Sequence, residues 1–439
     1  RQSLNNMEPK NSDYCNLAYR NKNCYLSFTA DEDQDCCYIR FADWNYRCLD
    51  CDYTYHSTDC YESIDLEKCN NVAYSQRCIN SSDLLACYNM IGCHDCIGSA
   101  NLRNKQFYIF NESCRGREEF LKRKAELNLA GYGDFQSFLK RYSEFLEKQP
   151  RRYLELVNCE NSVGDYLLSC KNAQFCYNGF ELEDCKYMIN CYKAKNCYDW
   201  DFVATTGSIN CHEMSSSAEH MVNCHFCSSC WVNDSDIYYC ELCLNSSNIF
   251  GCIGLRHKKY CILNKQYTKA EYEELLPKII EHMRQDGSWG EFFPMDLSTF
   301  AYNESVAYEF FPLTKEQVLA NGWRWIDDET EKMHRGPDYQ IADNVKDVPD
   351  EICKQILNCE ETGKPYKIIP QELNFCKMKG YPVPRVAPRQ RHKNRMDLRN
   401  PWQLWARKCD KCGMDIKTTY SPKRSEPVYC EKCYQGVLD

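Results

Sequence analysis

The sequence of 439 residues contains 34 cysteines and 32 tyrosines and has a net charge of −9. Such a high cysteine fraction is typical of small secreted proteins held together by disulfides, but this chain is far too long for that class. No apolar run is long enough to span a membrane, and the net charge gives no overall indication of a polyanionic partner. The length allows two to four domains, each with its own core.

The cysteines recur at regular intervals. Cysteine stands at every twelfth position from residue 24 to residue 60 and at every ninth position from residue 60 to residue 96. Between residues 170 and 261 the intervals are 15, then 13 and finally 9. Asn or Asp often precedes the cysteine and Tyr often follows it, as in NCYLSF, DCYESI and NCYKAK. Spacing of this kind indicates a structural unit that repeats.

The composition of the repeated unit is that of strands and turns. Short segments rich in Tyr, Ile, Val and Cys alternate with Asn, Asp, Ser and Gly, and no helical periodicity occurs between residues 15 and 110. We therefore predict a mainly β protein built on a β-solenoid of the parallel β-helix type, with coils of about 18 to 24 residues. Small apolar residues should face inward, and Asn side chains at the bends should stack into ladders.

The stretch NCHFCSSC and the nearby CELC pair allow three interpretations. Thiolates at CxxC spacing could hold zinc or an iron–sulfur cluster, and cysteines could also pair as disulfides. The 13-residue interval between the two stretches instead favours columns of buried thiols that pack like small hydrophobic side chains. We favour the columns for the five cysteines concerned, which are Cys224, Cys227, Cys230, Cys240 and Cys243.

A longer repeat divides the chain into two cassettes. The stretches CIGSANLRNKQFYIFN and CIGLRHKKYCILN match apart from an insertion, and a helical pattern follows each one. The helical pattern near residue 135 has one apolar stripe, and the later one begins with the capping box Thr268-x-x-Glu271. We predict a first solenoid cassette over 12–111, a helical cap over 112–155, a second cassette over 156–266 and a helical, aromatic cap over 267–326. Four basic residues at matching places in the cassettes could form anion sites or could be salt-bridge partners that finish the last coil: Arg103, Lys105, Arg256 and Lys258.

The composition of the sequence changes in its C-terminal third. An acidic linker is predicted over 327–350, and a segment over 351–400 has the outline of a zinc ribbon that retains only Cys359 of its first knuckle. The final module, 401–439, contains CDKC and CEKC on either side of the stretch GMDIKTTYSPKRSEPVY, with Gly413 directly after the first pair. This arrangement predicts a Cys₄ zinc ribbon with one structural Zn²⁺ held by Cys409, Cys412, Cys430 and Cys433. A closed Cys₄ site leaves no open position for catalysis, and the metal would supply folding free energy.

A basic run leads into this ribbon. Between residues 385 and 408 it has eight Lys and Arg side chains and one acid, Asp397. Phosphate neutralisation and base stacking would suit RNA or DNA, whereas an ordinary basic linker could dock on the acidic solenoid instead. The candidate contacts are Arg385, Arg389, Arg391, Lys393, Arg395, Arg399, Trp402, Trp405, Arg407 and Lys408.

Three stretches together resemble a known family. They are the tail RNPWQLWARKCDKCGMDIKTTYSPKRSEPVYCEKCY, the block CIGLRHKKYCILNKQYTKAEYEELLPKIIEHM and the Asn-Cys-Tyr repeats. The chain resembles a zinc-ribbon, cysteine-repeat family of ultrasmall candidate-phylum bacteria over nearly its whole length. That family has no established activity, so the resemblance implies the architecture and a cytoplasmic, reduced setting but no chemistry.

The function that these patterns favour is a non-enzymatic, zinc-binding scaffold whose basic ribbon tail contacts nucleic acid, a ribonucleoprotein or a protein partner. One alternative is a carbohydrate-active or surface-exposed β-helix, with candidate carboxylates in YDWD and FELEDC. Another is an iron–sulfur redox protein. No Walker loop, HExxH motif or nucleophile elbow is present, so an enzyme is the less favoured class.

Overall fold

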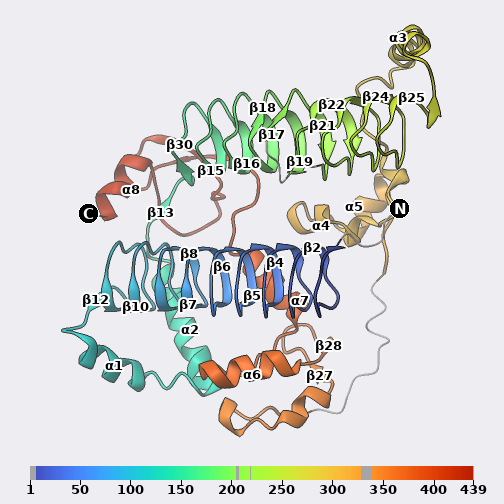
Figure 1. The fold of residues 1–439 in the computed structure, drawn as a ribbon. Coiled ribbons are helices and arrows are strands. Elements are labelled where there is room, and N and C mark those ends of the chain that lie inside the picture. The colour runs from blue at the N-terminus through green and yellow to red at the C-terminus, as the bar shows by residue number, and fades with distance from the viewer. Residues whose placement is uncertain (1–5, 204–206, 218, 328–338, 439) are drawn as a thin grey trace.

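The computed structural model describes residues 6–203, 207–217, 219–327 and 339–438. Two β-solenoids lie side by side and run in opposite directions, the first in blue and the second in green and yellow (Figure 1). Helices and a small C-terminal β module pack against them. The prediction of a mainly β protein with two cysteine-rich solenoids and a C-terminal ribbon is confirmed.

Nearly all strands belong to the solenoids and are short. The first solenoid contains β1 (Asn6–Met7), β2 (Asn16–Tyr19), β3 (Phe28–Asp31), β4 (Cys37–Asp43), β5 (Leu49–Tyr55), β6 (Tyr61–Glu67), β7 (Asn70–Ala73), β8 (Gln76–Ile79), β9 (Ser82–Leu85), β10 (His94–Ile97) and β11 (Gln106–Ile109). The second contains β14 (Leu156–Val157), β15 (Val163–Leu168), β16 (Gln174–Phe180), β17 (Lys186–Tyr192), β18 (Ala194–Lys195), β19 (Tyr198–Val203), β20 (Ser208–Ile209), β21 (His212–Ser215), β22 (Val222–Ser228), β23 (Ser235–Tyr238), β24 (Ser247–Phe250) and β25 (Lys259–Ile262).

The coils of the first solenoid are shorter than predicted. Parallel pairing joins Asn16 to Phe28 and Phe28 to Arg40, so the chain returns to the same place at every twelfth position. The longer coil predicted from pairs of cysteine intervals is therefore wrong. The prediction assumed sides built from strands of four to six residues, whereas the chain turns a corner after every third residue.

The corners are formed by left-handed backbone. From Glu8 to Phe110 every third residue has φ between +45° and +63°. Asn and Asp tolerate this conformation better than other residues with a side chain, and β-branched residues tolerate it least. The corner residue directly precedes the inward-facing one, which explains why Asn or Asp so often stands before cysteine in the sequence.

Away from the solenoid ends, the inward residue of each three-residue side is buried, and equivalent residues of successive coils form columns. Cys24, Cys36, Cys48 and Cys60 lie in one column and are at most 2 % exposed. The 9-residue interval that follows is three residues, or one side, shorter than a 12-residue coil. From residue 60 to residue 96 each cysteine therefore lies one coil further along and one side back from the previous one. All the reported cysteine intervals except 13 are multiples of three, and the 13-residue coils of the second solenoid contain one extra residue.

Thiols and amides complete the hydrogen bonding inside the solenoids. The Cys24 thiol donates to the carbonyl oxygens of Lys22 and Asp33, each at 3.4 Å, and most buried cysteines repeat this pattern. Asn side chains at the corners also form ladders, as predicted: Asn89 Nδ2 donates to Asn101 Oδ1 at 2.9 Å, and Asn178 donates to Asn190 at 2.8 Å. These bonds satisfy polar groups that burial would otherwise leave unpaired.

The solenoids end in the same way. Their last strands, β11 and β25, pair antiparallel with β12 (Glu112–Ser113) and β26 (Lys265–Gln266). Helices α1 (Arg117–Glu126) and α2 (Tyr132–Leu146) follow the first solenoid, and α3 (Lys269–Gln285) follows the second. The apolar stripe of α2, including Phe135 and Phe138, packs on the first solenoid, and the capping box of α3 is formed as predicted.

The remaining segments connect and cover the solenoids. The acidic linker predicted over 327–350 falls partly on residues 328–338, which lie outside the described residues. The other elements are β13 (Arg151–Arg152), β27 (Leu357–Asn358), β28 (Pro365–Tyr366), β29 (Trp405–Lys408), β30 (Asp415–Thr418), β31 (Val428–Tyr429), α4 (Val306–Phe310), α5 (Lys315–Ala320), α6 (Pro370–Lys379), α7 (Pro388–Met396) and α8 (Glu431–Leu438), with short 3₁₀ turns at Met295–Leu297, Tyr302–Glu304, Val345–Asp347 and Asp350–Lys354.

Candidate metal centre

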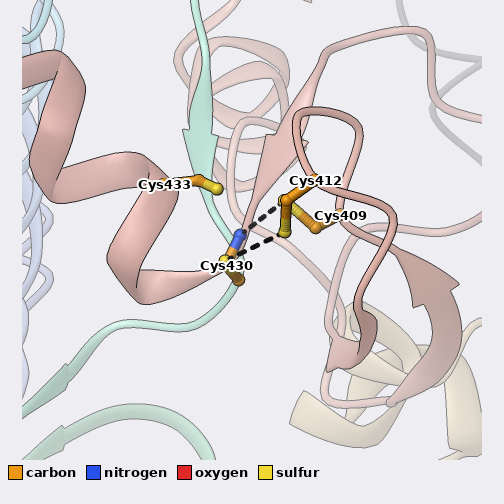
Figure 2. Close-up of side chains that lie close together, drawn as sticks. All are labelled: Cys409, Cys412, Cys430 and Cys433. Atoms are coloured by element: carbon orange, nitrogen blue, oxygen red, sulfur yellow. Dashed lines mark hydrogen bonds between the residues drawn. The ribbon is translucent and has the colours of Figure 1, made fainter.

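Four cysteines near the C-terminus bring their sulfur atoms together. Cys409 and Cys412 lie on the turn between β29 and β30, and Cys430 and Cys433 lie at the start of α8 (Figure 2). The four Sγ atoms are all within 4.8 Å of one another, and those of Cys412 and Cys430 are 3.8 Å apart. Tetrahedral ligation with Zn–S bonds of about 2.3 Å requires sulfur atoms about 3.8 Å apart, so the donor set fits a structural metal ion.

The backbone around Cys409 favours a thiolate. Gly413 adopts φ +76°, which lets its N–H reach the Cys409 carbonyl oxygen at 2.8 Å and closes the first knuckle. The Cys430 N–H lies 3.3 Å from Cys409 Sγ. Burial raises the pKa of the Cys409 thiol, but backbone donors from Cys430, Cys412 and Lys411 outweigh it and lower the pKa to about 6. The second CxxC pair differs in form from the first, because it lies at the first turn of helix α8.

A similar knuckle surrounds Cys359 in the segment 351–400. The Gly363 N–H donates to the Cys359 carbonyl oxygen at 2.8 Å, and the Ala387 N–H lies 3.3 Å from Cys359 Sγ. These contacts repeat those of Gly413 and Cys430 around Cys409. Within the described ranges, however, the C-terminal cysteines are the only set of three or more ligand side chains that gathers at metal-binding distances. The Cys359 knuckle is held instead by the apolar cluster that includes Tyr366 and Phe375.

The ribbon lies where the two solenoids are connected. Strand β31 pairs with β13, which belongs to the connection between the solenoids, and Arg152 binds the Glu431 carboxylate at 2.7 and 2.9 Å. Tyr434 Oη donates to Asn101 Oδ1 of the first solenoid at 2.8 Å. Thr419 Oγ1 donates to Asp165 Oδ2 of the second at 2.5 Å. The metal centre is therefore part of the junction between the solenoids.

Much of the basic run is buried against carboxylates of the first solenoid. Arg395, at 3 % exposure, lies 2.7 Å from Asp52 and 2.8 Å from Glu62. Arg391, at 4 % exposure, lies 2.8 Å from Asp50 and 2.7 Å from Glu372. These side chains come from α7, which packs on β5 and β6 (Figure 1). We call this group of two arginines and four carboxylates the α7 ion cluster.

His392 extends the α7 ion cluster toward α4. Its Nδ1 lies 2.9 Å from Asp52 and its Nε2 lies 2.8 Å from Glu309. Burial lowers the pKa of His392, but the two carboxylates outweigh this effect and raise the pKa above its ordinary value. Arg395 and His392 in turn overcome the burial of Asp52 and lower its pKa to about 2. His392 therefore joins α7, α4 and the solenoid through its two ring nitrogens.

Arg399 joins the two solenoids. Its guanidinium lies 3.2 Å from Asp65 and stacks 3.9 Å from the Tyr53 ring, both in the first solenoid. It also donates to Asn178 Oδ1 of the second solenoid at 2.6 Å. Nearby, Trp402 stacks on Phe310 of α4 with ring centroids 3.8 Å apart.

These contacts correct the prediction that the whole basic run contacts nucleic acid. Arg391, Arg395 and Arg399 are buried in ion pairs and cannot reach phosphates without leaving their carboxylates. Three further members are engaged within the protein: Arg385 with Glu360 and the Tyr132 ring, Trp402 with Phe310, and Arg407 with Asp410. Trp405 lies half-buried on β29, while Arg389, Lys393 and Lys408 are exposed, with Lys393 and Lys408 close to Asp397 and Asp415.

The other candidate residues are dispersed. Arg103 donates to the Asn89 carbonyl oxygen at 2.5 Å, whereas Lys105, Arg256 and Lys258 are exposed at the ends of the solenoids. The cysteines from 224 to 243 are buried on successive sides of the coil and donate to carbonyl oxygens, as the column interpretation expects. Two carboxylates of the enzyme alternative pair with lysines one coil away: Glu181 with Lys193 at 4.0 Å and Glu183 with Lys195 at 2.8 Å.

Comparisons with known proteins add little. No protein-family model matches the chain, and no curated protein matches it. One matching solved structure is a crystal structure of a putative acetyltransferase from Desulfovibrio desulfuricans G20, with 12 % identity over 55 % of this chain and 62 % of that one and a TM-score of 0.13. A TM-score this low supports no inference about fold or function. Among the described residues no helix is long and apolar enough to cross a lipid bilayer.

Proposed function

We propose that the protein is a non-enzymatic scaffold in which a structural zinc ion holds two rigid solenoids in a fixed side-by-side arrangement. The supporting observation is that the ribbon bonds to both solenoids, through Asn101 and Asp165, and to the connection between them. A thiolate set at tetrahedral spacing with no open position suits a structural ion rather than a catalytic one.

The inward cysteines support a reducing compartment, which we propose is the cytoplasm. Each column thiol that donates to a carbonyl oxygen would lose that bond on forming a disulfide. Each disulfide would therefore cost the hydrogen bonds of two buried thiols, at about 0.5–1.5 kcal/mol each. The hydrogen bonding of the solenoid core thus favours cysteine in its thiol form.

Hydrogen–deuterium exchange of the full-length protein, measured by mass spectrometry, tests the proposed role of the metal. Removal of zinc by a chelator, or Cys409→Ser, should speed exchange of the Arg151 and Tyr153 amides, which donate to Pro427 and Tyr429. The central coils of both solenoids should stay protected. Cys359→Ser serves as a matched control that alters a knuckle outside the metal site. If exchange at residues 151–153 does not change on metal loss, the ribbon is an appended module and the proposal is wrong.

A further inference from the structure

A cavity of about 440 Å³ lies between the two solenoids, and its lining includes no residue of the metal centre or of the α7 ion cluster. One wall comes from the N-terminal coils of the first solenoid, between Met7 and Tyr55, and the other comes from the second solenoid. Five aromatic side chains line it: Tyr19, Phe41, Tyr55, Tyr192 and Trp231. Its volume is in the range of cavities that bind small molecules. We call it the inter-solenoid cavity.

The charged groups of the inter-solenoid cavity are arranged unusually. Tyr19, Asp31, Asp43 and Tyr55 occupy equivalent positions in four successive coils, so two carboxylates stand side by side between two tyrosines. Like charges at adjacent positions of a sheet repel each other and destabilise it. Keeping both acids ionised there calls for a compensating positive charge.

The chain supplies that charge to only one of the two acids. Arg20 lies 3.2 Å from Asp31 and 2.5 Å from Glu32. Within the ranges that the structure describes, no Lys, Arg or His lies at ion-pair distance from Asp43, whose Oδ1 accepts the Asp31 N–H at 3.1 Å. Burial and the neighbouring Asp31 raise the pKa of Asp43 to about 6. Glu219 of the second solenoid adds a third acid to the lining.

We propose that the inter-solenoid cavity binds a small organic cation with an apolar body, such as an amine or a quaternary ammonium compound, with Asp43 as its counter-ion. Tyrosine and tryptophan faces attract such cations, and the attraction strengthens where water is excluded. Tyr192 and Trp231 would close on the ligand from the second solenoid, so binding would require both solenoids in place. The preference for a cation follows from the charge balance, because Arg20, the only basic side chain among the described lining residues, is already paired.

Titration of the full-length protein with three matched probes tests the proposal. Phenethylamine, 2-phenylethanol and phenylacetate share one ring and carry a positive, zero and negative charge. Isothermal calorimetry or ligand-observed NMR should give phenethylamine at least about tenfold tighter binding than the other two, the scale of a hydrogen bond to a charged group. Comparable binding of all three probes, or tighter binding of phenylacetate, would overturn the assignment.

Two variants of cavity residues and one control variant test where the amine binds. Asp43→Asn keeps the size and the contact to the Asp31 N–H but should weaken phenethylamine binding by roughly tenfold, with no effect on 2-phenylethanol. Glu183→Gln, an exposed carboxylate outside the cavity, should leave both unchanged. Trp231→Leu should weaken the amine as well, and it provides a second measurement if Asp43→Asn alters the circular dichroism or melting of the protein. Unchanged amine affinity in a folded variant of either residue would contradict the proposed site.

Discussion

Arg395 Nε lies 2.7 Å from Asp52 Oδ2, although the two residues are separated by 343 positions in the chain. Both side chains are fully buried, Arg395 at 3 % and Asp52 at 0 % exposure. The contact means that the most basic part of the sequence is an internal connection. The charges of Arg391, Arg395 and Arg399 neutralise acids inside the protein instead of facing solvent.

The first prediction follows from this contact. Arg395→Met should lower the free energy of unfolding by about 3–5 kcal/mol, because it removes one of the positive charges that compensate three buried carboxylates, Asp50, Asp52 and Glu62. Lys393→Met, two residues away but exposed, should change it by less than about 0.5 kcal/mol. Urea denaturation followed by circular dichroism measures both. An Arg395→Met protein as stable as the Lys393→Met protein would show that α7 is not anchored by these ions.

The α7 ion cluster also makes stability depend on pH. The folded-state pKa of His392 is raised, so its stabilisation is complete below about pH 6.5 and is lost as pH rises through the folded pKa. Burial raises the pKa of Glu372 too, and this group likewise loses its contribution with rising pH. The melting temperature should therefore fall as the pH rises above about 6.5.

His392→Gln should remove most of this slope and cost about 2 kcal/mol at pH 6, because it removes hydrogen bonds between charged groups. The exposed His257→Gln variant is the control and should retain the wild-type profile. Differential scanning calorimetry across the pH series provides the measurement. A slope that survives His392→Gln unchanged would assign it to the other carboxylates.

Metal content gives a third prediction. Elemental analysis should find one zinc ion per chain, and Cys409→Ser or Cys430→Ser should abolish it. Cys224→Ser and Cys359→Ser should retain it, because their thiols do not gather with other ligands. Iron, or two or more zinc ions per chain, would revive a cluster among the solenoid cysteines.

Thiol reactivity provides a fourth prediction. With a thiol reagent such as DTNB the folded protein should react slowly at nearly all cysteines between 15 and 261, since all of these except Cys159 are buried. After unfolding in denaturant without reductant, these thiols should react fully. If most remain unreactive until a reductant is added, they are disulfides, and the proposed cytoplasmic setting is wrong.

The left-handed corners lead to a fifth prediction. Asn245 is exposed and has φ +49°. Asn245→Val should destabilise the second solenoid by about 1–2 kcal/mol, because a β-branched residue is strained there, while Asn245→Gly should be close to neutral. Thermal melts of the two variants test the corner geometry. Equal stability of the two would mean that the backbone at Asn245 is not left-handed.

Some of this structure could be predicted from the sequence and some could not. The cysteine intervals predicted solenoids with inward thiols, and the two CxxC pairs predicted the metal ligands, because each pattern is local. The coil length is also encoded, since intervals of 9, 12 and 15 share the factor three, which fits a three-residue side better than the longer sides implied by the predicted coil. The partners of Arg391 and Arg395 could not be found, because a basic run looks the same whether it meets phosphates or the distant Asp50 and Asp52.

The three-residue side has a consequence for how such a protein can change its length. Inserting one more coil of four sides restores every column and lengthens the solenoid by about 4.8 Å, the spacing between neighbouring strands. An insertion near the free ends of the solenoid would leave the packing of the core unchanged. Between the coils that hold Asp52 and Asn101, however, it would separate the docking points of α7 and α8, which are carried on one C-terminal segment. The length of the C-terminal segment thus limits how many coils the first solenoid can have between these two docking points.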